Sequence, residues 1–409
     1  AEASRLVAAS IDRVDAQRLV RRETIGMLGE ASRPWLGVTL HEPDVDAALA
    51  EAAILVGAGV DLVRVEVPIG RELADRMTAA GMDVPEWQPR DRDDAGAEAT
   101  GDPVPTGSQR ALARLRDALD EAAARRRAYV RLATMSPSLG SPEGAVVAAS
   151  ERIDVIGSDA MSEIVAGVVE PDRALSDHAF AHRLADRAGT SIVVGAGPLV
   201  VAPDLSSGFP SDPSTRAGRA LALQLLGVML ARGDGLAPDH LIVDALPSWL
   251  IEESSPAARA IAEVTVRRAL YPSHALAFIE PSSRGDGSTR WPFVQAAAAA
   301  HAGDVALVLR AVDVRRAAAG TWARSARAAM EVSSDVGRAT VPGPLDGVAL
   351  AHARGMVATA LETLDRLGDD GWRTIAGDPH VMSRSRRGRD VIAERTDSFD
   401  PLAAILAAR

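Results

Sequence analysis

The sequence predicts a TIM-type (β/α)8 barrel with an N-terminal helical extension and an irregular C-terminal tail. Three observations support this α/β fold class. Short apolar runs that suit strands alternate with longer runs that have helical spacing, and about eight such alternations fit into the chain. The chain has 409 residues, of which 47% are hydrophobic, enough for one large core. Alternation favours a parallel sheet, and about eight repeats favour closure of that sheet into a barrel.

Residues 1–34 have helical spacing of apolar residues and are expected to form accessory helices. The barrel is expected over residues 35–361, with its first helices at Val45–Val56, Arg71–Ala80 and Gln109–Arg127. The predicted strands are Trp35–Leu40, Asp61–Val67, Tyr129–Thr134, Ile153–Gly157, Ser191–Gly195, Leu241–Leu246, Ala275–Ile279 and Val305–Leu309. The pattern of the last strand also fits a helix.

Three stretches interrupt this alternation. Residues 86–106 are acidic and rich in proline, which predicts a long surface loop. The irregular stretch Pro203–Pro213 follows the fifth predicted strand directly, and in a barrel this position belongs to the catalytic face. From Glu362 the pattern breaks into Gly, Asp, Arg and Ser, so residues 362–409 are predicted to be a tail that packs on the barrel or on a partner.

The composition excludes several kinds of chemistry. The chain has no cysteine, which removes disulfides, thiolate zinc sites and a cysteine nucleophile. All 45 basic residues are arginine, so this chain alone cannot form a Schiff base through a lysine amine. The histidines His178 and His182 have metal-ligand spacing on a predicted helix but lack a third ligand, which favours surface or interface packing over a metal site.

Charge and hydropathy indicate the partners that the chain avoids. The formal net charge of -11 argues against nucleic-acid binding, and we interpret the basic cluster Arg384–Arg389 as a solvated tail or a patch for an acidic partner. No apolar run approaches the roughly 20 residues that span a bilayer, and the amino-terminal stretch lacks a signal-peptide pattern. A cytoplasmic protein that acts on a small molecule is expected.

Barrel enzymes carry reactive groups where strands end, so polar residues at those points are the candidates for the pocket. Each has a structural alternative, because a carboxylate there can also cap a helix or pair with an arginine such as Arg64 or Arg131. The Ser136-Pro137-Ser138 turn could hold the phosphate or carboxylate of a cofactor, and helix capping explains it almost as well. The candidates are Glu66, Ser136, Ser138, Asp159, Asp244 and Glu280.

Two further motifs are weak. Gly195-Ala196-Gly197 is similar to a phosphate-binding loop, but the third glycine of a dinucleotide fingerprint is missing and Pro198 follows. Asp378-Pro379-His380 matches the start of a cobalamin-binding signature, yet Ser383 stands at the glycine position. We interpret the second match as chance, so any cobalamin-binding module must lie on another chain.

The stretch Pro142–Asp204 contains PEGAVVAASERIDVIGSDA and RALSDHAFAHRLADRAGTSIVVGAG, and it resembles the central region of lysine 5,6-aminomutase α subunits. The likeness extends more thinly over roughly residues 35 to 400. The matched elements are Gly59-x-Asp61, Tyr129-Val130-Arg131-Leu132, Pro142-Glu143, Glu151-Arg152-x-Asp154-Val155, Asp159-Ala160, Asp177 with Phe180, Ala188-Gly189 and Tyr271-Pro272.

This resemblance implies a barrel that pairs with a smaller subunit, which carries the cobalamin domain and the Schiff-base lysine. The implied activity is that of an isomerase: an adenosylcobalamin-dependent radical mutase in which an amino group migrates to the neighbouring carbon through a pyridoxal-linked intermediate. The protein then mainly positions and shields reactive species. A hetero-oligomer that shares adenosylcobalamin with its partner is therefore expected.

The chain departs from the family at the positions that would hold pyridoxal phosphate and substrate. Ser162 replaces a tyrosine that stacks on the pyridoxal ring, and Gly167 replaces an arginine that grips the substrate carboxylate. Further family contacts align near Gly197, Ala277, Val67 and Glu72. Losing an aromatic stack, a carboxylate clamp and a phosphate ligand together removes several kcal/mol of binding, which argues against pyridoxal phosphate and against ordinary lysine 5,6-aminomutase activity.

Three hypotheses follow. The first is a catalytic barrel subunit of an adenosylcobalamin-dependent mutase, whose substrate need not be lysine. The second is a non-catalytic barrel that serves as a partner or scaffold, suggested by Ser162, Gly167 and Ala277 in place of charged pocket residues. The third is a mutase of this architecture that works without pyridoxal phosphate and moves a carbon or hydroxyl group.

Overall fold

The computed structural model describes most of the barrel wall and the helices around it. The described residues are 2–40, 44–65, 109–134, 142–158, 161, 164, 171–195, 212–247, 250, 253–279, 291–302, 304–310, 316–339, 344–345 and 347–370. The predicted helix Arg71–Ala80, the predicted loop 86–106 and most of the stretch Pro203–Pro213 lie outside these residues.

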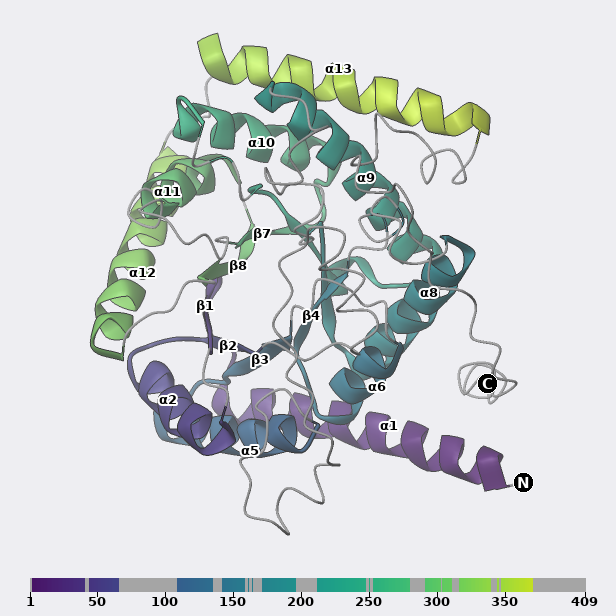
Figure 1. Ribbon diagram of the computed structural model, residues 1–409. Helices are drawn as coiled ribbons and strands as arrows, with labels where there is room; N and C mark the ends of the chain where they lie inside the picture. The colour runs from purple at the N-terminus through teal and green to yellow at the C-terminus, as the bar shows by residue number, and fades with distance from the viewer. Residues whose placement is uncertain are drawn as a thin grey trace.

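Eight parallel strands close into a barrel in chain order, as Figure 1 shows along the barrel axis. This arrangement confirms the predicted fold class, and it confirms the last predicted strand, whose pattern also fitted a helix. The strands are β1 (Trp35–Thr39), β2 (Leu62–Val65), β3 (Arg131–Thr134), β4 (Val155–Ser158), β5 (Ser191–Val194), β6 (Leu241–Asp244), β7 (Ala275–Ile279) and β8 (Val305–Arg310).

Helices surround the barrel and bury one apolar face each against the outward-facing side chains of the strands. A helix start shows how the sequence sets the bounds: Asp212 accepts a hydrogen bond from the Thr215 amide at 2.8 Å, and Pro213 occupies the first turn. The helices are α2 (Val45–Gly57), α5 (Gln109–Arg126), α6 (Pro142–Ser150), α8 (Pro171–Ala188), α9 (Pro213–Gly233), α10 (Pro256–Leu270), α11 (Trp291–Ala302) and α12 (Arg316–Ala339), with a short 3-10 helix at Pro238–His240.

The inside of the barrel is filled in layers, each made of residues from alternate strands. Strand register and the period of two in side-chain direction define these layers. From the amino-terminal end upward they are Trp35, Arg131, Ser191 and Ala275; then Leu62, Val155, Ile242 and Leu307; then Gly37, Ala133, Val193 and Ala277; then Arg64, Gly157, Asp244 and Leu309. The fourth layer lies toward the carboxyl ends of the strands and contains the charged residues Arg64 and Asp244.

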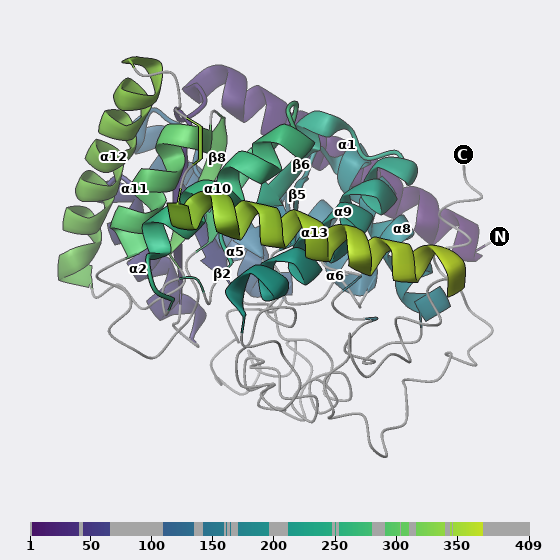
Figure 2. The same ribbon diagram turned by 90° about the horizontal axis from the view of Figure 1, so that it is seen from above.

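Two long helices lie outside the repeating unit. The helix α1 (Glu2–Leu28) crosses the amino-terminal end of the barrel, where it contacts α6 and α8 (Figure 2). At the other end of the chain, α13 (Gly347–Asp370) packs along α9 and α10. Among the described residues, no helix is both long and apolar enough to cross a bilayer.

The start of the irregular tail was predicted too early. Residues 362–370 continue α13, although the sequence pattern breaks at Glu362. Glu362 and Arg366 form an exposed ion pair one turn apart, whereas Thr363 is buried. The charged residues of this stretch therefore lie on the solvent face of the helix, which explains why composition alone suggested a tail.

Candidate active site

Of the pocket candidates, Asp244 lies in the part of the chain that the structure describes. It is the last residue of β6, at the carboxyl end of the barrel, and its side chain points inward in the same layer as Arg64. The other candidates, Glu66, Ser136, Ser138, Asp159, Ser162 and Glu280, lie outside the described residues and stay predictions.

The backbone holds the Asp244 carboxyl by a hydrogen bond. Its Oδ1 accepts a hydrogen bond of 3.4 Å from the Leu246 amide. Within the described ranges no arginine or histidine lies within ion-pair distance of this carboxyl. Burial therefore raises the pKa of Asp244 to about 8, while the more distant Arg267 and the surrounding backbone amides oppose this effect. The raised pKa favours the protonated carboxyl, which can donate a hydrogen bond into the barrel mouth.

Gln224 of α9 joins the ends of β5 and β6. Its Nε2 donates to the backbone carbonyl of Asp244 at 2.7 Å and to that of Val194 at 3.4 Å. The sequence analysis missed this residue, although a single amide inside the apolar run Leu221–Met229 was a usable signal.

The close approach of Gln224 also explains Gly195. This residue has a φ of 86°, and a Cβ placed on it would lie 2.2 Å from Gln224 Nε2. The glycine that was similar to the start of a phosphate-binding loop is thus required by the packing of Gln224. Gly197 lies outside the described residues.

A chain of buried polar side chains continues behind Gln224. Its Oε1 accepts a hydrogen bond of 2.9 Å from Arg267 Nε of α10, and Arg267 also pairs with Glu263 one turn earlier. His352 of α13 places Nε2 3.0 Å from Glu263 Oε1. Burial alone would raise the pKa of Glu263, but the positive charge of Arg267 and the contact with His352 lower it below its usual value.

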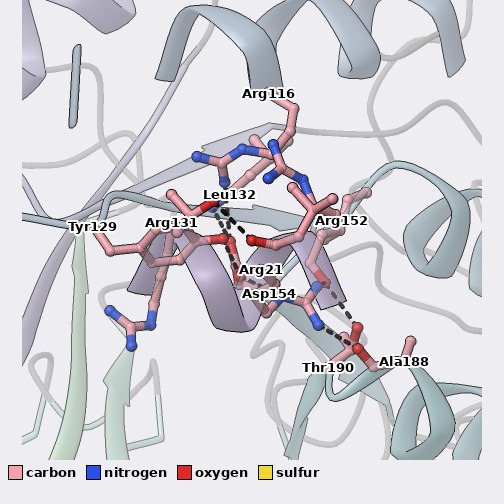
Figure 3. Close-up of polar contacts among 12 residues, drawn as sticks. Arg21, Arg116, Tyr129, Arg131, Leu132, Arg152, Asp154, Ala188 and Thr190 are labelled. Carbon is pink, nitrogen blue, oxygen red and sulfur yellow. Dashed lines mark hydrogen bonds and ion pairs between the residues drawn. The ribbon is translucent and has the colours of Figure 1, made fainter. Parts of the chain in front are cut away.

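The opposite end of the barrel contains a second polar network, drawn in Figure 3. Asp154, just before β4, pairs with Arg21 of α1 at 2.9 Å and with Arg116 of α5 at 3.1 Å. Its carboxyl also accepts hydrogen bonds from the Tyr129 hydroxyl at 2.8 Å and from the Leu132 amide at 2.9 Å. Every one of these groups is buried, so the network fixes α1 and α5 to the amino-terminal end of the barrel.

Asp61 repeats this arrangement two strands earlier. It stands just before β2 and accepts a hydrogen bond of 3.1 Å from the Leu36 amide. It also pairs with Arg126 and, at 2.7 Å, with Arg327. Both aspartates therefore hold the amino-terminal face, which in barrels of this type serves stability.

The position of two histidines needs a correction. The sequence favoured surface or interface packing, but His178 and His182 are both buried within the fold, and His182 Nδ1 lies 2.8 Å from Asp234 Oδ2 at the end of α9. Burial lowers the pKa of His182, although Asp234 opposes this effect. Among the residues that the structure describes, no group of three His, Asp or Glu side chains is arranged to hold a metal ion.

Comparison with known proteins identifies the family. A model of the D-lysine 5,6-aminomutase TIM-barrel domain of the alpha subunit matches residues 1–297. The chain belongs to this family. A curated relative, the lysine 5,6-aminomutase alpha subunit of Acetoanaerobium sticklandii, is 22% identical over 273 residues, which cover 67% of this chain and 48% of the relative. The chain thus spans about half the length of the curated relative that it matches.

The matches among solved structures are more distant in sequence. A dihydropteroate synthase from Coxiella burnetii in complex with pteroic acid is 11% identical, with a TM-score of 0.44 over 75% of this chain and 94% of that one. A spore coat polysaccharide biosynthesis protein from Bacillus subtilis is 12% identical, with a TM-score of 0.44 over 79% and 74% of the two chains. Similarities this low indicate nothing about function.

Much of the described family signature lies at the amino-terminal end of the barrel. Asp61 and Asp154 are the centres of the two ion networks there, Tyr129 precedes β3, and Gly189, with a φ of 69°, precedes β5. The aminomutase family likeness is therefore carried here by residues that hold the barrel together. Ala277, which aligns near a family lysine, is fully buried inside the barrel.

Proposed function

We propose that this chain is the barrel subunit of an adenosylcobalamin-dependent radical mutase, which acts with a separate cobalamin-binding subunit on a small molecule that need not be lysine. The observation that carries the proposal is the match of the aminomutase alpha-subunit barrel model to residues 1–297, together with the closed barrel of eight strands. When bound, adenosylcobalamin supplies the radical that starts the rearrangement.

The sequence of this chain favours an enzyme in which one subunit provides the barrel and another binds the cobalamin. The partial cobalamin motif of this sequence has Ser383 in place of glycine. We therefore assign the carrier of adenosylcobalamin to a separate subunit. What this barrel offers is an enclosed wall that keeps water from the reacting molecule, with a packed interior below.

The sequence of this chain offers little to hold pyridoxal phosphate. A Schiff-base lysine would have to come from the partner, and Ala277 offers neither a charge nor a side-chain hydrogen bond. We therefore favour a reaction without pyridoxal phosphate or with its amine anchor on the partner. The scaffold hypothesis predicts that no substrate is turned over.

We assign Asp244 the role of orienting the substrate. A neutral carboxylic acid in a buried position donates a hydrogen bond to a carbonyl, carboxylate or hydroxyl oxygen without placing a negative charge beside it. This role needs no proton transfer to or from Asp244 during the reaction.

The test is co-expression of the full chain with a protein encoded beside its gene that has a cobalamin-binding domain. A stable complex with the visible spectrum of bound adenosylcobalamin is the expected result, and each protein purified alone serves as the control. In an active complex, Asp244→Ala should assemble normally but lower turnover about 10- to 100-fold, since one hydrogen bond to the substrate is lost. If no such partner co-purifies, the proposal is wrong.

A further inference from the structure

A continuous series of buried polar contacts runs from α13 to the mouth of the barrel. It begins at His352, passes through Glu263 and Arg267 of α10, and reaches Gln224 of α9, which holds the last carbonyl of β6. All four side chains are almost fully buried. The last carbonyl of β6 belongs to Asp244, the acid described above.

Hydrogen bonding fixes the orientation of each member. Arg259 Nη1 lies 3.1 Å from His352 Nδ1 and can act only as a donor, so this nitrogen accepts. The proton of the imidazole is then on Nε2, from which it is donated to Glu263 Oε1 at 3.0 Å. Glu263 binds Arg267 with its other oxygen, and Arg267 donates to the Gln224 amide oxygen, which leaves the amide nitrogen to face the strands.

Burying two charges away from water is costly, and hydrophobic side chains of similar size commonly give equal or greater stability. Stability alone is therefore a weak reason for this series of contacts. The two groups that the series connects suggest another reason. One is His352 on a helix outside the barrel, and the other is the backbone at Asp244, where β6 ends at the barrel mouth.

We propose that His352, Glu263, Arg267 and Gln224 form a positioning relay that sets the place and the charge state of the Asp244 carboxyl, so that α13 takes part in building the barrel mouth. Gln224 fixes the backbone at Asp244 by its hydrogen bond of 2.7 Å. Arg267 supplies a positive charge behind the strand, and Glu263 offsets most of that charge. Arg267, and after it His352, favour the ionised form of Glu263 that provides the offset.

The packing of α13 fits this role. A Cβ on Gly218 of α9 would lie 2.5 Å from the Met356 carbonyl, and a Cβ on Gly355 would lie 2.7 Å from Ser214 Cβ. Glycine on both helices thus allows the close approach that inserts His352 between α9 and α10. His352 lies beyond the residues that the family model matches.

The charged groups around Asp244 define the test. Arg267 faces it from α10 with Glu263 behind, and Arg64 points into the same interior layer from β2. Glu66, Asp159 and Glu280 follow strands at this mouth but lie outside the described residues. Charge changes at Glu263 and Arg267 should therefore act on Asp244 with opposite signs, which a purely structural role would not produce.

The experiment follows the pH titration of the Asp244 carboxyl by 13C NMR in the full chain labelled at aspartate, with Asp244→Asn to assign the signal. Glu263→Gln leaves Arg267 without its offset and should lower the pKa of Asp244 by about half a unit to one unit. Arg267→Gln removes the positive charge and should raise it by a similar amount. The double variant, which is neutral as a pair, should return close to the wild-type value and guards against loss of folding in the single variants.

His182→Gln is the matched control, because it breaks another buried histidine–carboxylate contact, 2.8 Å long, that does not lead to the barrel mouth. It should lower the melting temperature and leave the Asp244 titration unchanged. An unchanged titration in both charge variants, or shifts of the same sign, would overturn the relay. The measurement needs neither a cobalamin partner nor a substrate, so its failure is distinct from failure of the proposed function.

Discussion

The aspartates Asp61, Asp154 and Asp244 differ in whether an arginine lies beside the carboxyl group. Asp61 and Asp154 each pair with two arginines. Asp244 has no such partner in the described part of the chain and receives a long hydrogen bond from the Leu246 amide instead. The surroundings therefore give these side chains different roles. Asp61 and Asp154 form ion pairs that anchor helices, whereas burial without such a partner raises the pKa of Asp244, which faces the interior of the barrel.

The raised pKa of Asp244 makes stability depend on pH in a direction that we can state. Between its usual value of 3.8 and about 8, the folded protein keeps this proton while the unfolded chain releases it. The folded state then binds more protons, so this group lowers the free energy of unfolding as pH rises, by up to about 1.4 kcal/mol per pH unit. Asp244→Asn removes this pH dependence. In urea unfolding, the difference in free energy of unfolding between the variant and the wild type should grow by several kcal/mol, in favour of the variant, from pH 5 to pH 8. Parallel curves for the two proteins would contradict this prediction.

Among the elements, α13 is the one whose position depends most clearly on small residues. It packs on α9 more extensively than any other pair of elements packs together, and Gly218 lies at that contact. Met356 and Ala360 of α13 are buried there, whereas Leu361 remains exposed. The helix is therefore fixed by a narrow apolar face together with His352, and widening the contact should release it.

Gly218→Ala tests this dependence. The added Cβ would meet the Met356 carbonyl and Thr359 Cβ at 2.5 Å, so α13 has to move away from α9. The variant should lose about 1–3 kcal/mol, as overpacked cores do, and hydrogen exchange should accelerate in α13 more than in the barrel strands. Gly233→Ala, at the end of the same helix with open space around it, is the control and should be neutral or stabilising. Equal exchange in both variants would show that α13 does not depend on this contact.

For the molecule as a whole, the strands were predictable because their signal is local. Runs such as Ala275–Ile279 contain the apolar pattern that forms them, and the structure gives the same bounds. The strand-end rule also selected Asp244, which is the last residue of β6. Its raised pKa and the relay behind it were not predictable, since Gln224, Arg267 and His352 come from three helices far apart in sequence and meet only through tertiary packing.

The two polar networks lie at opposite ends of the barrel. The Asp154 network contacts the starts of strands, and the relay contacts the carboxyl end of β6. The Asp154 network fixes α1 to the amino-terminal end of the barrel, and the relay connects α13 through α10 and α9 to the end of β6. They share no residue among the described contacts. Sites this far apart commonly contribute independently to stability, whereas members of one network are coupled.

A double-mutant cycle tests this independence. Asp154→Asn leaves Arg21 buried without its counter-ion and Arg116 paired only with Asp120, and it should cost about 3–5 kcal/mol. Glu263→Gln removes the counter-ion of the buried Arg267 and should cause a loss of similar size. In urea unfolding the two losses should add within about 0.5 kcal/mol. Glu263→Gln combined with Arg267→Gln should instead recover part of the loss, because the pair is removed together. Coupling well above that limit between Asp154 and Glu263 would mean that the barrel transmits strain between its ends, and the amino-terminal family signature would then also influence the mouth.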